Sequence, residues 1–232
     1  MAYKTSGANS GTGTSVTVTL GAAPADNDII VMLASMDYPD KTITFPAGFT
    51  SLAQGNITGP DGHNYAVAWK RAVSEGTTFA CGGDTDGADY TVQVFTFDGR
   101  HTVDPPVIGT VTVNTSSNSS PVTVTAPAVT AVAGDDILWI GVADTSGHDI
   151  GGAFAAPTDY TERQDTMFGW NTVSGASRDN VSAGSTGSIS GTLTLSSGTS
   201  GWASALIRIP AAAAAGDAVP VCWAQYRRRM AA

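Results

Sequence analysis

Two matching series of segments, one in each half of the chain, constrain the fold more than any other feature. The matched pairs, in the same order along the chain, are 28–32 with 136–140, 46–50 with 157–161, and 90–97 with 202–209. Similarity that recurs in order indicates an internal duplication. The sequence therefore predicts two equivalent halves, at 15–104 and 119–210.

Each half carries short segments typical of β-strands. Val16, Val18 and Leu20 alternate with threonines, which is the pattern of a half-buried strand. Continuous apolar runs begin at Ile29 and Ile137, and such runs are typical of strands buried on both faces. Only 13% of the residues are charged, so the chain lacks the side chains that favour a helix bundle.

These patterns predict an all-β fold, a two-sheet antiparallel β-sandwich of jelly-roll-like form built from two duplicated halves. One half alone would have a thin core and exposed edges, so we expect the halves to face each other in one domain over 15–210. Two separate small sandwiches are the alternative. We expect 1–14 to be a flexible N-terminal arm and 211–232 to be a C-terminal linker and tail.

The overall charge limits the partners. A net charge of −9 and a pI of about 4.5 argue against binding to nucleic acid or to an anionic membrane. No apolar stretch is long enough for a membrane span, and the first residues lack the apolar core of a signal peptide. Cys81 and Cys222 are far apart in sequence, which predicts free thiols.

The sequence shows little sign of catalysis. Only two glutamates are present, Glu75 and Glu162, and the aspartates lie mostly in glycine-rich turns, where their side chains commonly bind their own backbone. The three histidines are isolated, and no nucleophile-elbow or phosphate-loop motif occurs. We therefore expect a non-enzymatic protein without a cofactor.

One acidic turn is a candidate calcium site. Asp84, Asp86 and Asp89 lie in a glycine-rich segment, and calcium favours carboxylate oxygens in a flexible loop. The segment lacks the distal glutamate of an EF-hand. A polar hairpin turn without metal is the alternative.

Two aromatic residues are candidates for glycan binding. Tyr38 and Trp170 lie in polar, loop-like surroundings, where an exposed ring could stack on a sugar. Trp69, Trp139 and Trp202 lie within apolar strand patterns, so we expect them in the core.

The C-terminal tail combines apolar anchors with positive charge. The candidate partner-docking residues are Val221, Trp223, Tyr226, Arg227, Arg228 and Arg229. The arginines could meet an acidic surface, including that of another copy of this acidic chain. A solvated end without a partner is the alternative.

The two halves share a pattern of three segments. An apolar strand preceded by Asp comes first, a Pro-x-x-aromatic-Thr turn follows, and the last strand begins with an aromatic residue. Asp28, Pro46 and Phe49 carry this pattern in the first half, and Pro157 and Tyr160 carry it in the second. The pattern resembles the β-sandwich domains of tailed-bacteriophage virion proteins.

The resemblance implies a structural protein of the virion, assembled in the host cytoplasm and associated with other capsid or tail proteins. Within that class we expect a decoration or cement protein on the capsid exterior, attached by its terminal arms and forming a homo-oligomer. The alternative is a tail-associated adhesin that binds bacterial surface glycans. The family pattern implies no catalytic residues.

Overall fold

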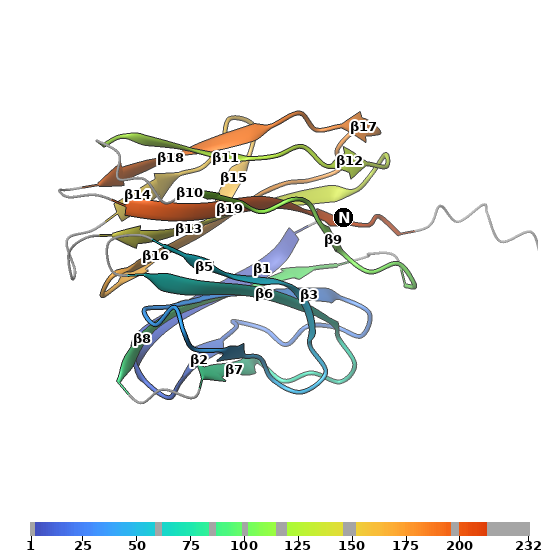
Figure 1. Cartoon of the computed structure of the whole chain (residues 1–232). Helices are drawn as coiled ribbons and strands as arrows, with labels where there is room; N and C mark the ends of the chain where they lie inside the picture. The colour runs from blue at the N-terminus through green and yellow to red at the C-terminus, as the bar shows by residue number, and fades with distance from the viewer. Residues whose placement is uncertain are drawn as a thin grey trace, which may run out of the picture.

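The computed structural model describes residues 3–58, 62–83, 87–98, 102–114, 120–145, 152–195 and 200–212. These residues form antiparallel β-sheets. The predicted all-β sandwich class is therefore confirmed. Figure 1 shows the sheets stacked in layers, with the first half of the chain below the second.

The described residues of the first half form an eight-stranded sandwich. A five-stranded sheet has the order β1-β8-β3-β6-β5, and a three-stranded sheet has the order β2-β7-β4. The succession 1-8-3-6 beside 2-7-4 is that of a jelly roll. The strands are β1 (Tyr3–Gly13), β2 (Ser15–Thr19), β3 (Ile29–Met36), β4 (Ile43–Thr44), β5 (Thr50–Ile57), β6 (His63–Arg71), β7 (Thr78–Gly83) and β8 (Ala88–Phe97).

The second half repeats this order. Its larger sheet runs β10-β19-β13-β16-β15, with β9 paired to β19, and its smaller sheet runs β11-β18-β14. A further pair, β12 with β17, has no counterpart among the described residues of the first half. The strands are β9 (Val107–Ile108), β10 (Thr112–Asn114), β11 (Val122–Ala126), β12 (Thr130–Ala131), β13 (Asp136–Thr145), β14 (Gly152–Ala155), β15 (Thr161–Phe168), β16 (Asn171–Arg178), β17 (Gly184–Ser185), β18 (Ile189–Leu195) and β19 (Ser200–Ile209).

Three apolar cores alternate with the sheets. One lies inside the first half and includes Ile30 and Met32, and one lies inside the second half and includes Trp139. The third, which we call the central core, lies between the halves, where Val31 packs with residues such as Ile140. The predicted burial of the β3 and β13 runs on both faces is confirmed, because each strand has one of these cores on either side.

The large sheets of the two halves face each other across the central core. Strand β1 contacts β15, β8 contacts β16, and β5 contacts β9 and β19. The strand order is therefore reversed between the facing sheets. The two halves face each other, as predicted. The fold has more than the two predicted sheets, because each half also closes a sandwich of its own with its smaller sheet.

Local details also match between the halves. The Asp28 carboxylate accepts a hydrogen bond from the Ala25 amide (2.8 Å), and the Asp135 carboxylate accepts one from the Val132 amide (2.7 Å). Asp28 thus corresponds to Asp135, and the sequence match of Asp28 with Asp136 is one residue out. A shift of one residue in a strand exchanges its two faces.

A β-bulge lies at the same place in both halves. The register of β5 against β6 shifts between Ser51 and Ala53, and that of β15 against β16 shifts between Glu162 and Gln164. Shared topology and a shared bulge are what an internal duplication would leave. The duplication itself stays a prediction.

The expected flexible N-terminal arm is wrong for the described residues. β1 pairs with β8 from Tyr3 to Gly13. Its small residues permit close packing: a Cβ at Gly7 would lie 3.0 Å from the Thr19 carbonyl oxygen. At the other end, the guanidinium of Arg163, in the second half, lies 3.9 Å from the centre of the Tyr3 ring. The segment is polar because β1 is an edge strand of its sheet.

Candidate functional site

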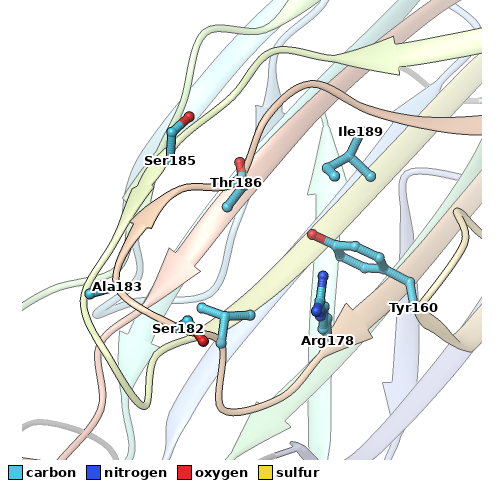
Figure 2. Close-up of a pocket in the computed structure, with 8 residues that line it drawn as sticks. Tyr160, Arg178, Ser182, Ala183, Ser185, Thr186 and Ile189 are labelled. Carbon is cyan, nitrogen blue, oxygen red and sulfur yellow. The ribbon is translucent and has the colours of Figure 1, made fainter.

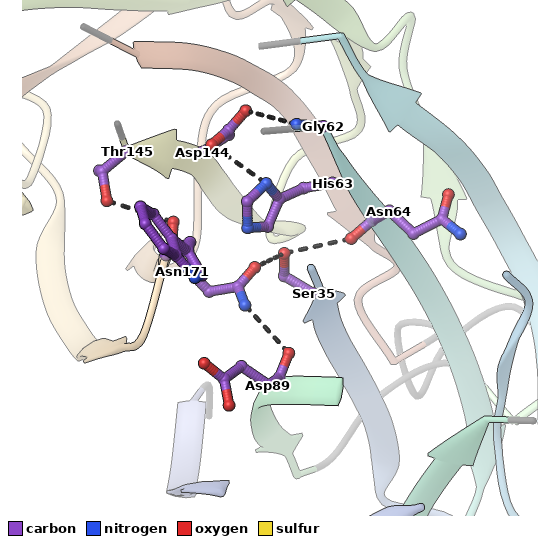
Figure 3. Close-up of polar contacts among 9 residues, drawn as sticks. Ser35, Gly62, His63, Asn64, Asp89, Asp144, Thr145 and Asn171 are labelled. Atoms are coloured by element: carbon purple, nitrogen blue, oxygen red, sulfur yellow. Dashed lines mark hydrogen bonds and ion pairs between the residues drawn. The ribbon is translucent and has the colours of Figure 1, made fainter. Parts of the chain in front are cut away.

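A buried polar network joins the two halves at one end of the central core (Figure 3). His63, at the start of β6, places Nδ1 3.1 Å from Oδ1 of Asp144, near the end of β13, and both side chains are fully buried. The Gly62 amide donates to the other Asp144 oxygen at 3.1 Å. The Asp144 carboxylate therefore holds the beginning of β6 from across the interface.

A second set of contacts extends this network. The Ser35 hydroxyl lies 2.7 Å from Oδ1 of Asn171 and 3.1 Å from the Asn64 carbonyl oxygen. The Asn171 amide group donates to the Asp89 carbonyl at 3.0 Å. Asn171 thus ties β16 of the second half to β3 and β8 of the first.

The network contains serine, histidine and aspartate but lacks the geometry of a hydrolase triad. A triad requires the histidine to bond the serine hydroxyl and requires access for substrate. Here the Ser35 hydroxyl contacts Asn171 and Asn64, and Nε2 of His63 is buried without a hydrogen-bond partner in the described structure. The His63 and Asp144 side chains are fully buried, and the arrangement fixes the halves relative to each other.

The predicted glycan-binding aromatics both adjoin this network. The Tyr38 carbonyl accepts a hydrogen bond from the Asn64 side chain (3.0 Å), and the Trp170 carbonyl accepts one from the Thr145 amide (3.0 Å). The Tyr38 side chain is exposed, whereas Trp170 is half-buried. The structure brings the two residues to the same end of the sandwich. Whether they bind a sugar stays a prediction.

Of the candidate calcium ligands, only Asp89 is among the described residues. It is buried, and its carboxylate accepts a hydrogen bond from the Thr12 hydroxyl at 2.6 Å. Asp84 and Asp86 lie outside the described residues. Within the described ranges, no group of three His, Cys, Asp or Glu residues could hold a metal ion.

The predicted docking tail lies outside the described residues. This applies to Val221, Trp223, Tyr226, Arg227, Arg228 and Arg229. Cys222 lies there too, whereas Cys81 is a free thiol buried in the core of the first half.

A pocket that sequence reasoning missed opens in the second half (Figure 2). Its volume is about 210 Å³, and it is lined by Tyr160, Arg178, Val181, Ser182, Ala183, Ser185, Thr186 and Ile189. Tyr160 follows the Pro157 turn, Arg178 ends β16 and Ile189 begins β18. The remaining residues come from the segment between β16 and β18, which contains β17. The segment between β16 and β18 is longer than the equivalent segment between β6 and β7, and this difference was the sequence signal for the pocket.

Burial governs the chemistry of the pocket tyrosine. Desolvation raises the pKa of Tyr160 to about 12, and the positive charge of Arg178 opposes this rise. The phenol therefore stays protonated at neutral pH and can donate a hydrogen bond. Figure 2 shows the tyrosine ring and the arginine side chain next to each other.

Comparisons with known proteins found no match, so a functional assignment has to start from the fold and these sites. No family model, curated protein or solved structure matches the chain. Within the described ranges, the structure has no helix that could span a membrane.

Proposed function

We propose that the chain is a non-enzymatic structural protein of a bacteriophage virion, acting as a decoration or cement protein on the capsid exterior. The observation that carries the proposal is the repeated jelly-roll strand order in two packed halves. Jelly rolls are recurrent building units of viral particles, although they also occur in lectins and enzymes. The support is therefore an analogy of architecture.

The packing of the halves fits a structural role. The central core and the His63–Asp144 contact join the two jelly rolls over a wide surface. Interfaces with buried, fixed contacts of this kind restrict relative domain motion. A rigid block suits a protein that must keep its shape on a particle.

The proposed attachment involves the C-terminal segment. Since residues 3–13 belong to a sheet, attachment by a free N-terminal arm has no support in the structure. The tail from Val221 to Arg229 stays the proposed docking element, with other virion proteins or further copies of the chain as its partners. Removal of residues 213–232 should then abolish particle binding while the sandwich remains folded.

Immunogold labelling of purified phage particles tests the location. An antibody against the sandwich should label the whole head if the protein decorates the capsid. Labelling confined to the tail would contradict a capsid location and favour the adhesin. Particles without label would contradict the virion proposal altogether.

The second candidate function is a tail-associated module that binds surface carbohydrate. The observation that favours it is the position of Tyr38 and Trp170 at the same end of the sandwich, with the Tyr38 ring exposed. Binding to bacterial cells should be saturable and should be lost in Tyr38→Ala. Binding that Tyr38→Ala leaves intact would contradict this role for the ring.

A further inference from the structure

The pocket in the second half has an equivalent corner in the first half, where an ion pair lies. In the strand registers, Lys70 pairs with Ile30 on β3, and Arg178 pairs with Ile137 on β13. Ile30 and Ile137 hold equivalent places, because each is the second residue after the matched aspartates Asp28 and Asp135 and each faces its own half's inner core. Lys70 and Arg178 are therefore equivalent cations.

The neighbouring aromatic positions are equivalent as well. The Phe49 amide donates to the Pro46 carbonyl (3.3 Å), and the Tyr160 amide donates to the Pro157 carbonyl (3.0 Å). Thr50 pairs with Trp69, and Thr161 pairs with Ser177, so the residue before each pair, Phe49 or Tyr160, lies at the position next to Lys70 or Arg178. The second half has exchanged a phenyl ring for a phenol at this corner.

The two corners differ in how the cation is neutralised. Nζ of Lys70 lies 2.6 Å from Oε1 of Glu75, and both side chains are mostly buried. In the second half, the residues that line the pocket include no carboxylate, and no described carboxylate forms an ion pair with Arg178. The first half carries an internal anion where the second half leaves an open pocket.

The remaining lining is rich in hydroxyl groups. Tyr160, Ser182 and Ser185 supply hydroxyls, while Val181 and Ile189 supply apolar surface. The Thr186 hydroxyl already accepts a hydrogen bond from the Val129 amide (3.0 Å) and donates one to the Gly187 carbonyl (2.9 Å). Hydroxyls both donate and accept hydrogen bonds, which suits the ring substituents of a sugar. A volume of about 210 Å³ lies below the range of roughly 300–1,000 Å³ for drug-sized ligands, so one sugar ring is an appropriate size.

We infer that this pocket binds a carboxylate-bearing sugar, such as a hexuronic acid, whose carboxylate takes the place that Glu75 holds in the first half. Arg178 forms the paired hydrogen bonds that a guanidinium makes to a carboxylate. The Tyr160 hydroxyl and the serines contact the sugar hydroxyls. The inference does not depend on the proposed virion role.

The experiment is a titration of the full chain with D-glucuronate, followed by NMR shifts and calorimetry. Binding should be saturable, and Arg178→Gln should weaken it about tenfold or more, since hydrogen bonds to charged groups contribute about 1.5–3 kcal/mol. D-Glucose should bind much more weakly than glucuronate. Lys70→Gln is the matched control at the equivalent corner and should leave the affinity unchanged.

A second variant gives an independent readout. Ser182→Glu places an internal carboxylate in the pocket, so it should raise the melting temperature and abolish glucuronate binding together. The absence of saturable binding by the native chain, or equal binding by folded Arg178→Gln, would overturn the inference. Acetate binding as tight as that of glucuronate would reduce the site to a simple anion site and would overturn the sugar assignment.

Discussion

The Phe95 ring of the first half occupies the space that a side chain at Gly175 of the second half would fill. Phe95 lies on β8 and Gly175 on β16, so the absence of a Cβ allows these strands to approach across the central core. Gly175 is required because the Phe95 ring leaves no room for a side chain. The backbone conformation of Gly175 would itself permit another residue.

Gly175→Val should destabilise the protein by about 1–3 kcal/mol, because the added methyl groups overpack the central core. Urea unfolding followed by tryptophan fluorescence measures the change. Gly21→Ala is the control, since a Cβ there meets no atom within 4 Å. Equal unfolding midpoints for Gly175→Val and the native chain would contradict the described packing.

Asp144→Ala should cost about 3–5 kcal/mol, because it leaves His63 and the Gly62 amide buried without their carboxylate partner. A double-mutant cycle with His63→Ala separates the pairwise contribution from the cavity effects. We expect a coupling free energy of about 0.5–3 kcal/mol, as for residues in one network. Additive single effects would show that the pair does not act as a unit.

Asp165→Asn should stabilise the protein at neutral pH. Desolvation raises the pKa of the Asp165 carboxyl from 3.8 to about 6 in the folded state, so the native protein loses stability as pH rises through this interval. Asparagine keeps an acceptor for the Phe154 amide without the charge. The residue retains exposed surface, so we expect a gain of under about 1 kcal/mol.

The pH dependence checks this assignment. The difference in melting temperature between Asp165→Asn and the native chain should be largest above pH 6 and should vanish below pH 3.8. A difference that stays constant across this range would refute the role of ionisation.

The Cys81 thiol should resist modification in the native protein. The side chain is fully buried, and desolvation raises the pKa of its thiol to about 12, so the reactive thiolate is scarce. In a Cys222→Ser background, a thiol reagent should label the chain only after denaturant is added. Rapid labelling without denaturant would show that the core of the first half opens readily.

Deletion of residues 1–14 should destabilise the protein and promote aggregation, because it exposes the edge of β8 along its length. Light scattering and thermal unfolding measure the two effects. Deletion of residues 213–232 provides the comparison, since the described strands end at Ile209. A fully stable N-terminal deletion would restore the interpretation of this segment as a free arm.

The predictable part of the fold was the part with clear apolar patterns. The runs at Ile29 and Ile137 identified the central strands because their side chains are buried on both faces. β1 and β16 escaped detection because small and polar residues form them: β1 lies at a sheet edge, and β16 needs Gly175 beneath Phe95. Propensity does not report such tertiary requirements.

The sites were less predictable. His63 and Asp144 are distant in sequence, and only the facing of the two sheets brings them together. The contrast between Lys70, which pairs with Glu75, and Arg178, which lines the pocket, becomes visible only after the two cations are matched through strand register. The one-residue error in the sequence alignment would have hidden this relationship.

The ion-paired Lys70–Glu75 corner and the open Arg178 corner carry a consequence for how such a protein can evolve. In a symmetric dimer of single jelly rolls, one gene would encode both corners, and every mutation would alter them together. In one continuous chain, one corner can keep its stabilising ion pair while the other accumulates changes. Covalent joining thus separates selection for stability from selection for the binding that we infer at the Arg178 corner.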